Sequence, residues 1–194
     1  MLFAATRRRN GRGGVDYRTM VTRPRPRARL SHVDSQGEAR MVDVGGKPET
    51  AREAVASAAV RMKPATLALV ARGTGARGKG DVLATARLAA IAALKRTADW
   101  IPLCHPVRVV GIDVGLTLDR ALPGVRVRVA VRAFDRTGVE MEAMVGAAAA
   151  ALTVYDMVKG AERGVEIRAV RLEEKRGGKS GEWRRGRRPS GREA

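Results

Sequence analysis

The sequence of 194 residues predicts an α+β fold, in which helices cover an antiparallel β-sheet. Hydrophobic residues make up 44% of the chain, which is enough to bury a core in a domain of this length. Residues 107–118 and 125–134 alternate apolar and polar side chains on either side of Pro123 and Gly124, the pattern of a β-hairpin. Residues 138–159 form a long Ala-rich segment without a proline, as expected for a helix.

The other elements are predicted from shorter patterns. In chain order they are a strand at 38–44, a helix at 49–62, a strand or short helix at 64–71, a Gly-rich loop at 73–80, a helix at 82–97 and a last strand at 164–173. The Ile101-Pro102 pair ends the helix that precedes it. The resulting order, β-α-(α)-α-β-β-α-β, is typical of an antiparallel sheet packed against helices.

The chain is strongly basic, with 38 Lys and Arg residues, 20 Asp and Glu residues and a formal net charge of +18. Ten of these charges come from the Arg-rich ends at 1–27 and 182–194, which lack apolar periodicity. We therefore expect disordered basic tails at 1–28 and 182–194, around a folded domain at 29–181. The remaining charge of +8 is ordinary for an enzyme that binds an anionic substrate.

A nucleic-acid-binding module is a second class of function that the charge suggests. Proteins that bind single strands stack bases on exposed aromatic rings, and this chain has six aromatic residues in all. Three of them lie in the tails, while Trp100, Phe134 and Tyr155 are scattered through the domain. The sequence therefore argues against nucleic acid as the partner.

The sequence favours a cytoplasmic protein without a membrane partner. No window approaches the ~18 apolar residues of a membrane span. The apolar stretch at residues 1–5 is too short for a signal peptide and is followed closely by Arg7. Cys104 is the one cysteine, so no intrachain disulfide can form, which fits a reducing compartment.

The loop at 73–80 imitates two phosphate-binding motifs. Gly73, Gly75 and Gly78 match G-x-G-x-x-G, and the loop also matches G-x-x-x-x-G-K. A P-loop needs Ser or Thr where Gly80 stands, which argues against a P-loop nucleotidase, the third class of function. A flexible basic loop is the simpler interpretation, and Lys79 could bind phosphate from it.

The turn from Ile101 to Pro106 presents Cys104 and His105 between two prolines, directly after a helix. Proline fixes φ and removes a backbone donor, so this turn is expected to be rigid. One cysteine beside one histidine does not make a zinc site, and we predict no metal site. A thiolate nucleophile and a purely structural role for His105 both stay open.

Carboxylates stand near both ends of the long predicted helix. Glu140 and Glu142 lie in its first turn, where they could cap the helix or act in a site. Asp156 and Lys159 lie near its end, three residues apart on one face. They could form a surface ion pair of little energetic value, or they could shuttle protons.

The spacing along this helix has a consequence for the site. Glu142 and Asp156 are 14 residues apart, which puts them on one face and about 21 Å apart along the axis. One small substrate cannot reach both residues in a single chain. If both act on it, the active site lies at an interface between chains.

The basic segment from Lys175 to Gly181 follows the last predicted strand. A Gly-rich basic strand end can cradle phosphate. A plain flexible tail is the alternative.

Taken together, these motifs resemble the family of molybdenum cofactor biosynthesis protein C (MoaC), the cyclic pyranopterin monophosphate synthases. The resemblance covers about residues 29–181, so both tails lie outside it. The matching segments, in order, are Leu30 to Asp34, Met41 to Val44, Lys79 to Val82, Lys95 to Thr97, Ile101 to Pro106, Thr137 to Ala143, Leu152 to Met157, Lys159, and Gly177 to Gly181.

The resemblance implies a ferredoxin-like fold and a homohexamer, a trimer of dimers with active sites at subunit interfaces. It implies a lyase whose substrate is 3′,8-cyclo-7,8-dihydroguanosine 5′-triphosphate, a GTP-derived product of a radical enzyme. The products are cyclic pyranopterin monophosphate and pyrophosphate. No cofactor is expected, although Mg²⁺ can accompany the phosphates.

The motif matches also imply roles for single residues. Asp156 matches the catalytic acid/base, Lys159 its partner, and Lys79 a lysine that faces the same site. The implied substrate-binding residues are Leu103, Cys104, His105, Glu140, Met141 and Glu142. Lys175 and Lys179 could bind the triphosphate with the other lysines. Proton transfers would suit Asp156, His105 and a lysine of lowered pKa.

Overall fold

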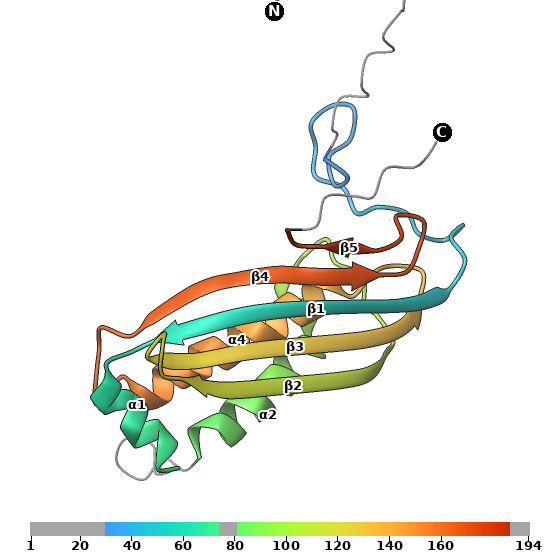
Figure 1. The fold of residues 1–194 in the computed structure, drawn as a ribbon. Helices are drawn as coiled ribbons and strands as arrows, with labels where there is room; N and C mark the ends of the chain where they lie inside the picture. Colours follow the sequence, from blue (N-terminus) through green and yellow to red (C-terminus); the bar gives the residue numbers. More distant parts are fainter. Residues whose placement is uncertain (1–29, 74–80, 187–194) are drawn as a thin grey trace, which may run out of the picture.

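The computed structural model describes residues 30–73 and 81–186, and it has the α+β architecture that the sequence predicts (Figure 1). In chain order the elements of this part are β1 (Thr50–Arg61), α1 (Pro64–Ala71), α2 (Val82–Leu94), α3 (Thr97–Trp100), β2 (Val109–Asp119), β3 (Gly124–Asp135), α4 (Glu140–Val158), β4 (Glu166–Arg176) and β5 (Trp183–Arg184).

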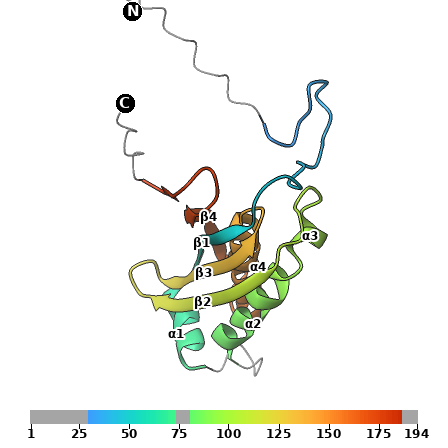
Figure 2. The ribbon, with the colours of Figure 1, turned by 90° about the vertical axis from the view of Figure 1, so that its right-hand side faces the viewer.

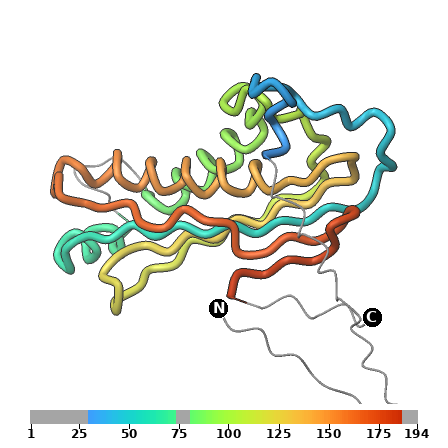
Figure 3. Tube along the Cα trace, turned by 90° about the horizontal axis from the view of Figure 1, so that it is seen from above, coloured from blue at the N-terminus to red at the C-terminus, as the bar shows by residue number. Residues whose placement is uncertain are grey.

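The strands form one antiparallel sheet in the order β2-β3-β1-β4-β5. Strands β1 to β4, with α2 after β1 and α4 after β3, have the βαββαβ connectivity of a ferredoxin-like fold. Figures 2 and 3 show α2 and α4 against one face of the sheet. This two-layer arrangement brings the turns and loops of the candidate site together at one end of the sheet.

The strand β1 occupies the segment that the sequence analysis assigns to a helix at 49–62, so that prediction is wrong. The segment is rich in alanine, which is the best helix former in isolation. Ala54, Ala56, Ala58 and Val60 recur every second residue and are at most 4% exposed. Since β1 pairs with β3 on one side and β4 on the other, pairing and burial override the local preference.

The strand predicted at 38–44 is also absent from the sheet. Residues 30–49 lead into β1 from a part of the chain that projects beyond the sheet (Figure 1), where a single bridge pairs Val33 with Ala39. The Asp34 carboxylate closes a turn there by accepting hydrogen bonds from two backbone N–H groups, at 2.8 and 3.0 Å. Apart from that bridge, the described part of the chain pairs no strand with 38–44, so its apolar-polar alternation has no ladder to join.

The remaining sequence predictions are largely confirmed. The hairpin is β2 and β3, the long Ala-rich helix is α4, and the last predicted strand is β4. The ambiguous segment at 64–71 is a helix, α1. The helix predicted at 82–97 is divided, because α2 ends at Leu94 and the short α3 begins at Thr97.

The tail predicted to be disordered from 182 is partly ordered. Trp183 and Arg184 form β5, which pairs with the end of β4. The Arg185 backbone N–H also donates to the Glu173 carbonyl at 2.8 Å. The edge of β4 that faces away from β1 would otherwise have unpaired backbone N–H and C=O groups, and residues 183–185 form hydrogen bonds with some of them. The other residues of the predicted tails, 1–28 and 187–194, lie outside the described residues.

The helix α4 forms the centre of the core, packed against α2 at its side and against β1, β3 and β4 below it. Its small side chains allow a close approach: a Cβ at Gly146 would stand 3.2 Å from side-chain atoms of Leu94 in α2 and Val129 in β3. Among the described residues, α4 is the one helix long and apolar enough to cross a membrane. Its packing on the sheet accounts for this composition, because a core helix meets the same criteria.

Candidate active site

Three segments that are far apart in the sequence converge at one end of the sheet. They are the turn between α3 and β2, the first turn of α4, and the glycine-rich loop after β4. These segments carry the predicted substrate-binding residues Leu103, Cys104, His105, Glu140, Met141, Glu142, Lys175 and Lys179. Leu103, His105 and Met141 are half-buried there.

The Glu142 carboxyl group is the most deeply buried ionisable group of this cluster, with 3% of the residue exposed. The Cys104 Sγ–H group donates to Glu142 Oε1 at 4.0 Å, while Oε2 has no hydrogen-bond partner among the described residues. Burial raises the pKa of Glu142 to about 7, and the negative charges of Glu140 and Asp135 act in the same direction. The Cys104 thiol has a raised pKa, first through burial and then through Glu142 and Glu140.

A lysine from β4 faces the other carboxylate in the first turn of α4. Lys175 Nζ lies 3.7 Å from Glu140 Oε1, and it also donates to the Ser180 hydroxyl. The side chain of Lys175 is only 19% exposed, so this ion pair is partly shielded from solvent. The contact joins the start of α4 to the loop after β4.

A pocket of about 570 Å³ opens beside this ion pair. It has a strongly positive lining, with six cationic side chains and one carboxylate. The cations are Lys47, Arg52, Arg136, Lys175, Arg176 and Lys179, and the carboxylate is Glu140. Backbone and hydroxyl groups of Ser31, Thr137, Gly138, Gly177 and Ser180 complete the lining. Such a pocket suits a ligand with several negative charges.

Four of these cations, Lys47, Arg52, Arg136 and Arg176, were not among the predicted site residues. Arg52 was assigned to a helix, whereas it stands near the start of β1 and lies against the loop after β4. A Cβ at Gly178, which has a φ of +69°, would overlap the Arg52 guanidinium. A period of two in 54–60 was the signal that could have placed Arg52 correctly.

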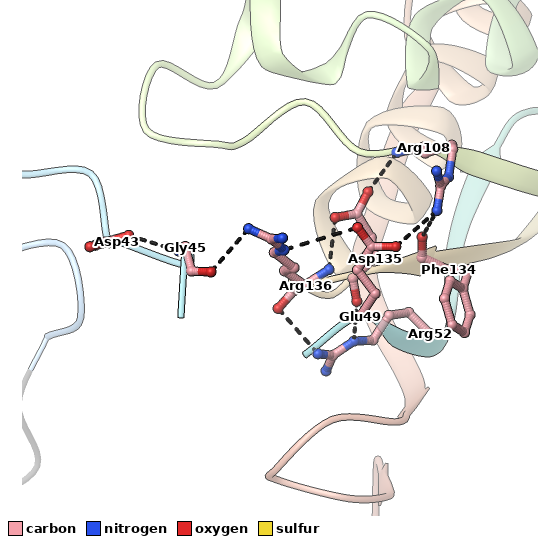
Figure 4. A network of polar contacts seen from close by, with 8 residues as sticks. All are labelled: Asp43, Gly45, Glu49, Arg52, Arg108, Phe134, Asp135 and Arg136. Carbon is pink, nitrogen blue, oxygen red and sulfur yellow. Dashed lines mark hydrogen bonds and ion pairs between the residues drawn. The ribbon is translucent and has the colours of Figure 1, made fainter. Parts of the chain in front are cut away.

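A network of polar contacts borders the pocket (Figure 4). The Arg136 guanidinium donates to the Gly45 carbonyl at 3.0 Å and lies 4.0 Å from Glu49. The Arg108 guanidinium donates to Glu49 at 3.1 Å. Arg136 therefore links the segment that leads into β1 to the loop that leads into α4.

Asp156 and Lys159 lie at the other end of α4, about 21 Å along the helix axis from Glu142. They form an ion pair in which both side chains are more than half exposed. The pKa of Lys159 is raised, because the Asp156 carboxylate accepts its hydrogen bond and favours its charge. This direction is opposite to the lowered pKa expected for a lysine that acts as a base.

Two further points concern phosphates and metals. Lys79 lies outside the described residues, and the neighbouring Asp81 caps α2 by accepting from two backbone N–H groups at 2.8 and 3.0 Å. Within 30–73 and 81–186, no group of three His, Cys, Asp or Glu side chains could hold a metal ion.

The comparison with known proteins now gives the family. The model of the MoaC family matches residues 41–178 of the chain. The chain belongs to the MoaC family. Relatives named cyclic pyranopterin monophosphate synthase from Brucella ovis and Brucella abortus are 56% identical over 155 residues, and one from Brucella canis is 55% identical. Each alignment covers 80% of this chain and 93% of the relative. Every predicted site residue except Lys179 lies within the matched range.

Proposed function

We propose that this chain is a cyclic pyranopterin monophosphate synthase, a phosphorus–oxygen lyase of molybdenum cofactor biosynthesis. Its substrate is (8S)-3′,8-cyclo-7,8-dihydroguanosine 5′-triphosphate, which rearranges to cyclic pyranopterin monophosphate and pyrophosphate. The observation that carries this proposal is the 56% identity to relatives of that name over 93% of their length. The geometry of the candidate site supports each part of this reaction.

The positive pocket supports a triphosphate substrate. Six cations and one carboxylate line the pocket, so their net positive charge can neutralise several phosphate charges. Two of the cations, Arg136 and Arg176, also face the carboxylates of Glu49 and Glu53 outside the lining. Because negative charge grows on the pyrophosphate as it leaves, the same cations stabilise the transition state. We assign the triphosphate to this pocket and the leaving pyrophosphate to Lys175 and Lys179.

Glu142 supports recognition of the guanine-derived part of the substrate. A carboxylate accepts hydrogen bonds from N–H donors on such a ring, and a protonated carboxyl group donates one. With a pKa of about 7, Glu142 can take either form near neutral pH. His105, in the neighbouring turn, can take part in proton transfers during ring opening and closure.

Asp156 acts as the acid/base, and Lys159, whose raised pKa keeps it charged, is its cationic partner. Both residues come from a second copy of the chain. A two-fold axis across the middle of α4 reverses the direction of the helix, which brings Asp156 of one copy near the partner's Glu142. Leu88 of α2 and Leu152 of α4 are 68% and 51% exposed, and they supply apolar surface on the helix layer for such contacts. The assembly that we propose is a homohexamer made of three such dimers.

The reaction is a rearrangement with loss of pyrophosphate and needs no redox cofactor. Mg²⁺ is proposed only as a companion of the substrate phosphates. Lys79 lies outside the described residues and is proposed to bind the substrate phosphates together with the other lysines, as the match to the family implies. The proposed location of the enzyme is the cytoplasm.

The experiment is a turnover assay. The full chain is incubated with the cyclic triphosphate that the radical enzyme makes from GTP, and pyrophosphate and pterin are measured. We expect equal amounts of both products. No product from a folded wild-type chain would contradict the proposed function, and an Asp156→Ala chain as active as wild type would contradict the role of Asp156.

A truncated chain serves as the control for nucleic-acid binding. Deletion of residues 1–29 and 187–194 removes most of the basic tails and leaves β5 intact. The proposed function predicts that this chain keeps its turnover. If the tails carried the function, the truncated chain would lose it.

A further inference from the structure

Asp135, the last residue of β3, joins two of the segments that meet at the candidate site. Its Oδ2 atom accepts a hydrogen bond from the backbone N–H of Arg108 at 2.9 Å, and Oδ1 accepts one from the backbone N–H of Arg136 at 2.7 Å (Figure 4). Arg108 stands three residues after His105. Arg136 begins the segment that leads to Glu140 at the start of α4.

The backbone of Asp135 is itself held by the sheet. Arg52 Nε, from β1, donates to the Asp135 carbonyl at 3.2 Å, and Arg52 also donates to the Arg136 carbonyl at 3.1 Å. The Arg108 guanidinium donates to the Phe134 carbonyl at 3.1 Å. The carboxylate of Asp135 therefore extends from a fixed point toward the turn that carries Cys104 and His105.

That turn has few other backbone donors with which to anchor itself. Pro102 and Pro106 have no N–H group, and the Cys104 N–H donates within the turn, to the Ile101 carbonyl at 2.9 Å. The bond from Arg108 to Asp135 is a contact between the end of this turn and a different element. The pKa of Asp135 is lowered, first by the Arg108 N–H, so its carboxylate is ionised at neutral pH and binds both N–H groups strongly.

We propose that Asp135 is a positioning residue, whose carboxylate holds the turn with Cys104 and His105 at a fixed place relative to the start of α4. It acts through the backbone of Arg108 and Arg136. Its kinetic consequence rests on the proposed function, because catalysis depends on how closely the reacting groups are placed. Its structural consequence can be tested without any turnover.

The chain offers a matched control at the far end of the same hairpin. Asp119 also accepts hydrogen bonds from two backbone N–H groups, those of Ala121 at 2.8 Å and Leu122 at 3.0 Å. It pairs with Gly124 at the start of β3, so the length of that strand separates it from Asp135 by about 35 Å. Asp119→Asn therefore perturbs the same kind of contact away from the site.

The first measurement is the rate at which iodoacetamide alkylates the native chain. Cys104 is the only cysteine, lies in the turn and is half-buried, so the rate reports how well the turn shields its thiol. We expect Asp135→Ala to label about tenfold faster than wild type, and Asp135→Asn, which keeps one acceptor, to lie between them. Asp119→Asn should label at the wild-type rate. If Asp135→Ala does not fold, Asp135→Asn carries the same comparison.

The second measurement is turnover. We expect kcat of Asp135→Ala to fall by about 10- to 100-fold, while KM stays within about threefold because the cations of the pocket are retained. Asp119→Asn should keep the wild-type kcat. Wild-type labelling and kcat in both Asp135 variants would overturn the inference and leave the proposed function intact. If the wild-type chain has no turnover, the proposed function fails, and labelling alone decides the role of Asp135.

Discussion

The Glu142 carboxyl group lies at the N-terminal end of α4, where the helix dipole favours a negative charge. That effect contributes roughly 0.3–1 kcal/mol at an exposed position. Burial acts in the opposite direction and is the larger effect, because it raises the pKa of Glu142 to about 7. Helix capping, the alternative that the sequence left open, therefore does not account for the raised pKa of this residue. With this pKa, the Glu142 carboxyl group exchanges between its protonated and ionised forms near neutral pH.

A stability measurement can detect this pKa. Between pH 4.5 and about 7 the folded chain binds the Glu142 proton more tightly than the unfolded chain, so the free energy of unfolding falls as the pH rises. Glu142→Gln removes this ionisation. From about pH 5 to pH 8, the unfolding free energy of the variant relative to that of wild type should therefore rise by about 2–3 kcal/mol. Urea unfolding at the two pH values, at one protein concentration, measures this change. An equal difference at both values would contradict it.

Ala169, in β4, is the one non-glycine residue with a positive φ (53°) in 30–73 and 81–186. It lies where the ladder between β1 and β4 shifts its register, at a β-bulge. Glycine adopts this conformation without the clash of a Cβ.

We predict that Ala169→Gly raises the free energy of unfolding by about 0.5–1 kcal/mol. Ala59→Gly is the control, since Ala59, which pairs opposite Arg168 next to this shift, has a negative φ and should lose about that amount. Urea midpoints of the two variants measure both effects. A loss of stability in Ala169→Gly would show that the Ala169 methyl group packs favourably.

At the scale of elements, β1 and α4 show what the sequence can and cannot predict. Both are rich in alanine, and local propensity assigns a helix to each. The assignment is right for α4, which extends over 19 residues, and wrong for β1, which is paired on both sides. Strand pairing is a long-range interaction, so no local window of the sequence contains it.

The close packing of α4 gives a second prediction at this scale. A larger side chain at Gly146 would overlap Leu94 and Val129, so Gly146→Val should lower the free energy of unfolding by about 2 kcal/mol despite its better helix propensity. Gly160→Val is the control, because no atom lies within 4 Å of a Cβ at that position. Chemical unfolding of both variants measures the difference. Equal free energies of unfolding for the two variants would mean that α2 and α4 can move apart without a loss of stability.

For the whole molecule, the sequence predicted the distance between Glu142 and Asp156 better than it predicted the residues around them. The spacing of Glu142 and Asp156 predicted opposite ends of one helix, and α4 confirms this because a helix has a fixed rise per residue. The positive pocket could not be predicted in full. Lys47, Arg52 and Arg136 reach it only because β1 and β3 are neighbours in the sheet.

In the proposed function, two copies of the chain complete each active site of a cyclic pyranopterin monophosphate synthase. In a dimer of one Glu142→Gln chain and one Asp156→Ala chain, one site carries both changes and the other carries neither. Each variant alone should be inactive. Equal mixing makes half of the dimers hybrid, so turnover should return to about a quarter of the wild-type value. Turnover that stays at zero, in mixtures where native mass spectrometry verifies the hybrids, would contradict the shared site.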